Sequence, residues 1–285
     1  MPVFLKKTKK IPLTSIQLPS SKSESNRALI INALSGSKTT VENISDARDT
    51  QTMVKLLRSD EKVMDVLDAG TTMRFLIAYC SVLNLNRVLT GTERMQERPV
   101  GILIEALREL GANINYLRKE GFPPVEILSF PQQFKDHISI RGDVSSQFIS
   151  ALLMIAPVLP RGLTLELTGK IASKPYITMT LGIMNYYGIK FNWEENVIAI
   201  RSQPYVSKAF RVNPDWSGAS YWYSLVALAE DAEIFLPGLT DKSFQGDKVI
   251  SEIMNPSIAL ALGQWSYQTM RPCKNSKRCQ KNYSP

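Results

Sequence analysis

Histidine and cysteine are scarce in this sequence of 285 residues, which contains one histidine and three cysteines. Three cysteines are too few for a disulfide scaffold, and Cys273 and Cys279 lack the CxxC spacing or the nearby histidine of a zinc site. The histidine, His137, lies in an alternating segment that favours a strand, and no serine or cysteine has the local signature of a catalytic triad. We expect a structural His137, reduced cysteines and no metal.

Long hydrophobic runs are also absent. The longest, "ALLMIAPVL" at residues 151–159, is too short to cross a bilayer, and the lysines near the N-terminus are not followed by the apolar segment of a signal peptide. The sequence has no Walker loop, HExxH motif or Rossmann glycine fingerprint, which disfavours nucleotide hydrolysis and zinc chemistry. We expect a soluble, cytoplasmic protein with no membrane partner.

Acidic residues are missing from residues 256–285, and basic residues gather at both ends of the chain. The formal charge of the whole chain is +8, but without the nine terminal cations 25 basic residues face 26 acidic ones. The body of the protein is therefore nearly neutral and does not predict a nucleic-acid partner. The nine cations are Lys6, Lys7, Lys9, Lys10, Arg271, Lys274, Lys277, Arg278 and Lys281.

A pattern recurs four times along the chain. Small, capping-type residues open almost wholly apolar segments at 18–30, 68–83, 142–159 and 214–229, which predict buried helices. Amphipathic segments, often closed by glycine, begin at 49, 98, 174 and 246, which is 29 to 31 residues after Ser20, Ala69, Asp143 and Asp215. Short strand-like runs between them make the repeat roughly βαββαβ. This organisation predicts an α/β fold in which buried helices bundle inside and sheets wrap around them.

The repeats also predict the domain organisation. Residues 19–210 hold three units and form a complete domain, which we expect to be the substrate-binding half. Residues 1–18 with 211–255 form part of a second domain. Trp216, Trp222 and Leu225 of that part are apolar and would be exposed if its buried helix found nothing to pack against. Residues 256–285 form an atypical basic tail, which a truncated or frame-shifted end explains better than a disordered tail that binds an acidic partner.

The starts of the apolar helices collect cationic and hydroxyl side chains. Lys22, Arg27, Ser145, Ser146 and Lys174 lie at or near them, where unpaired N–H groups and the helix dipole favour an anion. Each residue has a simpler explanation, because serines cap helices and surface cations pair weakly with acids. Recurrence of the same chemistry at equivalent positions favours a site for more than one anion.

Six blocks of sequence carry a family resemblance. "LPSSKSESNRAL", "DAGTTMRFL", "LTGTERMQERPVG", "GDVSSQFISALLM", "SKPYITMTL" and "SFQGD" together resemble the 5-enolpyruvylshikimate-3-phosphate synthase family, in unbroken order from residue 18 to 254. The sister UDP-N-acetylglucosamine enolpyruvyl transferases share the fold but have a reactive cysteine in the loop that corresponds to "GTERMQERP" here, which has none. That family remains the alternative.

The resemblance implies a reaction and a set of site residues. The family transfers the carboxyvinyl group of phosphoenolpyruvate to the 5-hydroxyl of shikimate 3-phosphate and releases phosphate, on the route to chorismate and the aromatic amino acids, without a metal or organic cofactor. By resemblance Lys22 is catalytic and touches both substrates, and Asp49 acts indirectly. The shikimate 3-phosphate site would contain Lys22, Ser23, Arg27, Ser145, Ser146, Gln147, Ser173 and Tyr176, with Ser23 and Arg27 on the carboxylate. The phosphoenolpyruvate site would contain Lys22, Gly70, Arg98 and Gln147.

The sequence departs from the family in two ways. Asp68 and Phe75 replace asparagine and proline in the second block, which puts sensitivity to glyphosate-type inhibitors in doubt. The family has two domains of three units, and the second domain here keeps one unit, without the family's aspartate base, glutamate and late cationic groups. We expect a monomer with impaired or no turnover, the alternative being a non-catalytic fragment that only binds shikimate 3-phosphate.

Overall fold

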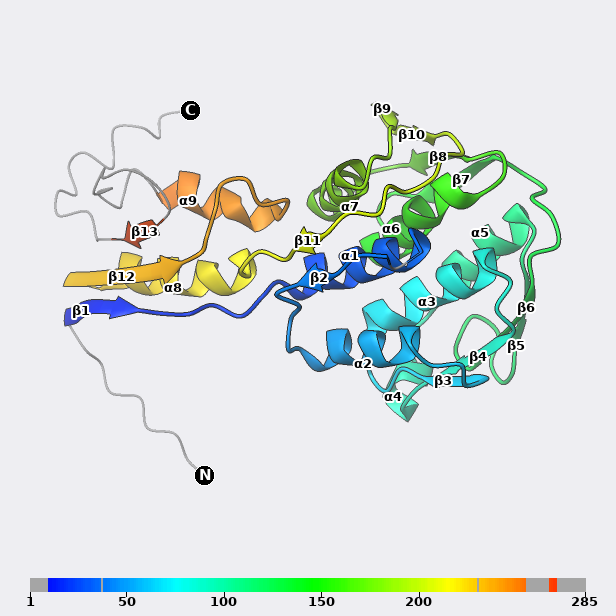
Figure 1. Cartoon of the computed structure of the whole chain (residues 1–285), viewed down its shortest axis with the longest axis horizontal. Coiled ribbons are helices and arrows are strands. Elements are labelled where there is room, and N and C mark those ends of the chain that lie inside the picture. Colours follow the sequence, from blue (N-terminus) through cyan, green and yellow to red (C-terminus); the bar gives the residue numbers. More distant parts are fainter. Residues whose placement is uncertain (1–9, 37, 230, 255–266, 271–285) are drawn as a thin grey trace. The chain divides into compact units, whose positions relative to one another are not determined.

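The computed structural model describes residues 10–36, 38–229, 231–254 and 267–270 (Figure 1). The chain divides into two compact units, Met1–Ser21 with Asn213–Pro285 (unit 1) and Lys22–Val212 (unit 2). The domain assignment made from the sequence, with its functional labels, stays a prediction. The predicted basic tail lies outside the described residues except for one short strand, 267–270.

Unit 2 is built on three inner helices that pack against one another: α1, α3 and α6. Three outer helices cover the grooves between them, because α2 contacts α1 and α3, α5 contacts α3 and α6, and α7 contacts α6 and α1. Inner helices are buried on nearly every side, and outer helices bury one face. α3 and α6 are largely apolar, as the hydropathy pattern predicts, whereas α1 buries polar residues, Glu24 to Arg27, in its N-terminal half. The helices are α1 (Lys22–Leu34), α2 (Arg48–Leu57), α3 (Gly70–Val82), α4 (Glu93–Gln96), α5 (Gly101–Leu110), α6 (Ser146–Ile155) and α7 (Lys174–Tyr186), with the short η1 (Ala156–Val158).

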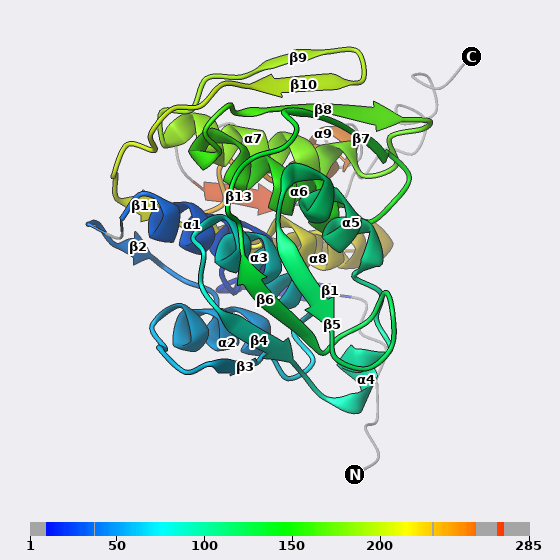
Figure 2. The same ribbon diagram turned by 90° about the vertical axis from the view of Figure 1, so that its right-hand side faces the viewer.

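Two sheets of unit 2 share one topology and lie on the outside of the helices (Figure 2). Their orders are β3-β4-β6-β5 and β7-β8-β10-β9, each with one parallel pair followed by two antiparallel pairs. The strands are β3 (Val63–Asp65), β4 (Arg87–Thr90), β5 (Asn113–Tyr116), β6 (Val125–Ser129), β7 (His137–Arg141), β8 (Leu163–Thr168), β9 (Asn192–Glu194) and β10 (Val197–Ile200). The predicted α/β arrangement of buried helices wrapped by sheets is confirmed.

The first repeat of unit 2 differs from the other two. Its sheet has two strands, β2 (Val41–Glu42) and β11 (Phe210–Arg211), which pair in parallel. Residues 58–62 lead from α2 straight into β3, whereas α5 is followed by the hairpin β5–β6 and α7 by the hairpin β9–β10. The first repeat therefore lacks the hairpin that the βαββαβ pattern leads us to expect.

Unit 1 packs one apolar helix on a small sheet. β1 (Lys10–Ser15) pairs in parallel with β12 (Asp231–Pro237), which pairs antiparallel with β13 (Tyr267–Met270). α8 (Trp216–Leu228) packs on β12, on η2 (Gly246–Lys248) and on α9 (Val249–Met254). Trp216 is 0% exposed at the centre of this core and Trp222 packs against it, whereas Leu225 is 42% exposed. The condition for exposure is not met, because the described sheet, η2 and α9 cover one face of the predicted buried helix.

Candidate functional site

The first turns of the inner helices of unit 2 are joined by side-chain hydrogen bonds. The Asp49 carboxylate accepts from the Thr72 hydroxyl at 2.6 Å and from the Asn26 amide at 3.3 Å, which ties α2 to α3 and to α1. The Gln147 amide donates to the Thr71 hydroxyl at 3.3 Å, which ties α6 to α3. The N-terminal ends of α1, α3 and α6 therefore meet in one region, and their dipoles favour negative charge there.

Arg27 lies deep among these helices. Its Nε donates to Thr180 at 2.7 Å, and its two terminal nitrogens donate to Ser150 at 3.0 Å and to the Ser23 carbonyl at 3.0 Å. The side chain is 3% exposed, and its Cζ lies 5.5 Å from the Phe75 ring centroid. Burial lowers the pKa of Arg27 to about 10, so the guanidinium stays charged at neutral pH.

Arg98 covers the start of α3. A Cβ placed on Gly70 would lie 2.2 Å from a terminal nitrogen of Arg98, so the guanidinium occupies the space that any other residue would fill. This nitrogen also donates to the Asp68 carbonyl at 3.4 Å. Glycine at the first position of the helix thus lets a guanidinium lie beside the helix start, where an anion would bind.

Arg74 is a second guanidinium at the start of α3, and sequence reasoning did not assign it. It donates to the carbonyls of Gly70 at 3.1 Å and of Pro99 at 2.7 Å. Burial, and then the neighbouring charge of Arg98, lowers the pKa of Arg74 to about 10. One arginine inside an otherwise apolar helix was the sequence signal that could have identified it.

Several predicted site residues have unused donors. The Lys22 ammonium and the hydroxyls of Ser23, Ser146 and Ser173 make no hydrogen bond to another described residue. Ser145 caps α6 by accepting from the Gln147 N–H at 3.4 Å, so the capping explanation applies to its oxygen. Donors without partners in a cationic region are available to an oxyanion.

The predicted residues occupy the starts of four helices of one unit. Lys22, Ser23 and Arg27 lie on α1, Gly70 begins α3, Ser145, Ser146 and Gln147 begin α6, and Ser173 and Tyr176 begin α7. Tyr176 joins the group through Arg27, whose Cζ lies 5.8 Å from its ring centroid. Their binding roles stay predictions.

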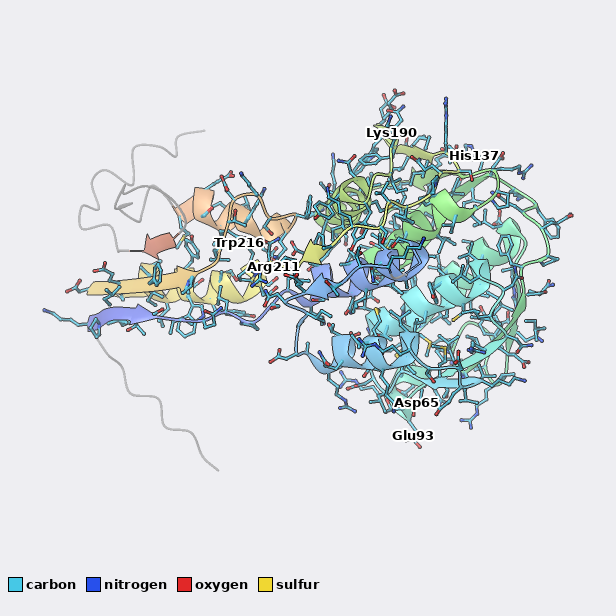
Figure 3. All side chains as sticks on the ribbon, viewed as in Figure 1. Asp65, Glu93, His137, Lys190, Arg211 and Trp216 are labelled. Atoms are coloured by element: carbon cyan, nitrogen blue, oxygen red, sulfur yellow. The ribbon has the colours of Figure 1, made fainter. Side chains whose placement is uncertain are left out.

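Two other groups lie apart from this region. His137 is on β7, with its Nε2 3.8 Å from a Glu166 carboxylate oxygen, and it projects from the outer sheet in Figure 3. Lys174 lies over the Trp193 ring at 5.3 Å, although it begins α7.

Within the residues that the structure covers, no cluster of three or more His, Cys, Asp or Glu side chains could hold a metal ion. None of the helices in those residues has the length and hydropathy that a membrane crossing requires.

A sequence model of the family described as EPSP synthase (3-phosphoshikimate 1-carboxyvinyltransferase) matches residues 7–59 and 58–264. The chain belongs to the EPSP synthase family. This assignment favours the shikimate enzymes over the sister transferases that the sequence left as an alternative. The 3-phosphoshikimate 1-carboxyvinyltransferase of Bacteroides fragilis strain YCH46 is 52% identical over 240 residues, which cover 84% of this chain and 58% of that protein.

The chain is also similar to more distant members of the EPSP synthase family. The enzyme of the same name from Shewanella woodyi is 36% identical over 269 residues, covering 84% of this chain and 63% of that one. The solved EPSP synthase of Acinetobacter baumannii superposes with a TM-score of 0.75 at 17% identity, over 93% of this chain and 65% of that chain, which shows the shared fold. The chain spans less than two thirds of the length of these relatives.

Proposed function

We propose that this protein binds shikimate 3-phosphate and phosphoenolpyruvate and acts in the transfer of the carboxyvinyl group to the 5-hydroxyl of shikimate 3-phosphate, with release of phosphate. The observation that carries the proposal is the meeting of the helix starts of unit 2, where cations and unused hydroxyls gather and α3 and α7 have no side-chain cap. Both substrates are anions. Lys22 and Arg98 form no ion pair with a carboxylate among the described residues, so pairing with surface acids does not account for these two cations.

The residues divide between the two substrates by their place in unit 2. The hydroxyls at the starts of α6 and α7, with Lys22, suit the phosphate of shikimate 3-phosphate, because a phosphate accepts several donors at once. Arg98 over Gly70 suits phosphoenolpyruvate, because a guanidinium binds a carboxylate or phosphate with two parallel hydrogen bonds. The N–H groups of Arg27 that have no protein acceptor would donate to the shikimate carboxylate, and Tyr176 would lie beside that carboxylate.

Calorimetric titration of the chain with shikimate 3-phosphate tests the binding part of this proposal. Lys22→Gln should weaken binding about tenfold or more, since it removes a charge-assisted contact. The matched control is Lys190→Gln, which changes a lysine beyond the C-terminal end of α7 (Figure 3) and should leave affinity unchanged. Equal losses in both variants, or no binding to the unaltered chain, would refute the assigned site.

A phosphate-release assay with both substrates tests turnover separately. Release that depends on both substrates and is lost in Lys22→Gln supports the transferase activity for this chain. Binding of shikimate 3-phosphate without phosphate release would support a binding role alone. In that assay Arg98→Gln should raise the phosphoenolpyruvate concentration needed for half-maximal release more than that of shikimate 3-phosphate.

A further inference from the structure

A cavity of about 430 Å³ opens in unit 2 at the end of the helices opposite the candidate site. Ala33 of α1 and Val54 of α2 give it apolar walls, and Asn32, Thr39, Arg58 and Tyr79 bring polar groups to it. Gly70 and Tyr79 are both on α3, and nine residues of helix separate them by about 14 Å. The cavity is therefore separate from the helix starts that carry the predicted substrate contacts.

The cavity lies in the first repeat, which has no hairpin after its outer helix. In the second repeat β4 and β6 pack on α3, and β5 packs on α5. In the first repeat β2 packs on α1, but residues 58–62 cross directly to β3 and supply no hairpin. The faces of α1 and α2 that carry Ala33 and Val54 are left to line a hollow of the size that small ligands occupy.

The side chains of the cavity favour an anionic ligand, although the C-terminal ends of α1, α2 and α3 nearby carry partial negative charge. Arg58 is exposed and forms no ion pair with any described residue, and none of the residues that line the cavity is acidic. The Tyr79 hydroxyl makes no hydrogen bond within the described part of the chain, and burial raises the pKa of Tyr79, so it remains a donor at neutral pH. Asn32 accepts from the Thr39 hydroxyl at 3.3 Å, which leaves its amide N–H groups for a ligand.

We propose that this cavity binds a small monocarboxylate with an apolar body. The carboxylate contacts Arg58 and the Tyr79 hydroxyl, because one unpaired guanidinium and neutral donors match a single negative charge. The apolar body lies between the α1 and α2 faces, where burial of hydrocarbon adds affinity without a polar partner. A dianion such as a sugar phosphate would leave one charge unmatched in this cavity.

An amide NMR titration of the chain with phenylacetate tests the proposal, with phenylacetamide as the uncharged counterpart. Phenylacetate should shift the amide signals around residues 29–33, 39–44 and 54–58 and bind at least about fivefold more tightly than phenylacetamide. Arg58→Gln should weaken phenylacetate about tenfold and leave phenylacetamide unchanged. Lys55→Gln, one turn away on α2 and outside the cavity, should change neither.

A second variant tests the cavity itself. Ala33→Leu places a larger apolar side chain in the hollow and should abolish binding of both compounds, while circular dichroism confirms that the chain stays folded. Arg98→Gln should leave phenylacetate binding unchanged, because Arg98 belongs to the helix starts. The proposal fails if no binding is seen at about 10 mM phenylacetate. It also fails if the shifts concentrate at the starts of α1, α3 and α6, or if Arg58→Gln has no effect on affinity.

Discussion

Helices α3 and α8 hold equivalent places in their repeats, yet their first turns are opposite in character. α3 begins with Gly70 under the Arg98 guanidinium and has no side-chain cap. α8 is capped by Asp215, whose carboxylate accepts from the Gly218 N–H at 2.9 Å, while the Gln245 side-chain oxygen accepts from the Trp216 N–H at 2.9 Å. One helix start carries a cation and open N–H groups, and the other is closed by the protein's own oxygens.

The difference shows that a repeated fold does not repeat its binding chemistry. The first N–H groups of an apolar helix can donate to an external anion or to a side chain of the protein. In α3 the position before the helix is Ala69, which has no oxygen to offer, and in α8 it is an aspartate. Anion binding by the described helices is therefore expected in unit 2 and not at the start of α8.

The largest expected effect concerns whether the two units depend on each other. Trp216→Ala removes a side chain with no exposed surface and should destabilise unit 1 by about 4 kcal/mol. Leu228→Ala, at an 88% exposed position on the same helix, should cost less than about 0.5 kcal/mol. Urea unfolding followed by tryptophan fluorescence measures both.

Cys80 reports on unit 2 in the same experiment. It is buried on α3, and burial raises the pKa of its thiol to about 12, so it should resist alkylation until unit 2 unfolds. With Cys273 and Cys279 changed to serine, Trp216→Ala should leave the rate of Cys80 labelling unchanged. Faster labelling would show that the helix bundle of unit 2 needs the core of unit 1.

Arg27→Met should separate binding from stability. Burial disfavours the charged form of Arg27 more than the nearby Tyr176 and Glu24 favour it, as the lowered pKa indicates, so methionine should leave the free energy of unfolding unchanged or raise it by about 1 kcal/mol. Affinity for shikimate 3-phosphate should fall about 100-fold with the loss of the guanidinium. Calorimetry and urea unfolding measure the two quantities, and a stability loss above about 2 kcal/mol would mean that Arg27 serves the fold first.

Gly70→Ala tests the open start of α3 directly. The added Cβ would displace the flexible end of Arg98 and not the backbone, so the fold should persist with a stability change below about 1 kcal/mol. Phosphoenolpyruvate binding, measured by titration in the presence of shikimate 3-phosphate, should weaken about tenfold. Gly91→Ala is unsuitable as a control because its Cβ would meet the Leu67 carbonyl at 2.4 Å. Gly218→Ala, in the first turn of α8, brings its Cβ only to ordinary contact distances and should leave phosphoenolpyruvate binding unchanged.

The smallest expected effect concerns the closed start of α8. Asp215→Ala removes the cap and should cost about 1 kcal/mol, and Asp215→Asn should retain most of that stability because the amide oxygen accepts the same hydrogen bond. Thermal unfolding of the two variants measures the difference. Phosphate binding created by Asp215→Ala would contradict the comparison, because it would mean that the Asp215 cap alone keeps an anion from the start of α8.

The sequence predicted the helices better than the contacts of their polar residues. The spacing of the repeats identified inner and outer helices, because hydrophobic periodicity is local information. The burial of Arg27 was not predictable, since its partners Ser150 and Thr180 lie 123 and 153 residues away in the chain. Gly70 and Arg98 could be assigned to one substrate by resemblance, but no local pattern reveals that one fills the space above the other.

The sequence by itself determined the α/β class, the apolar inner helices and the gathering of cations and serines at their starts, because these follow from composition and from periods of a few residues. Only the tertiary structure decided which donors remain unused, that Trp216 is covered, and that a cavity lies in the repeat with the short connection after α2. Those outcomes depend on packing between segments that are distant in sequence, and a side chain's partner is fixed only when the helices assemble.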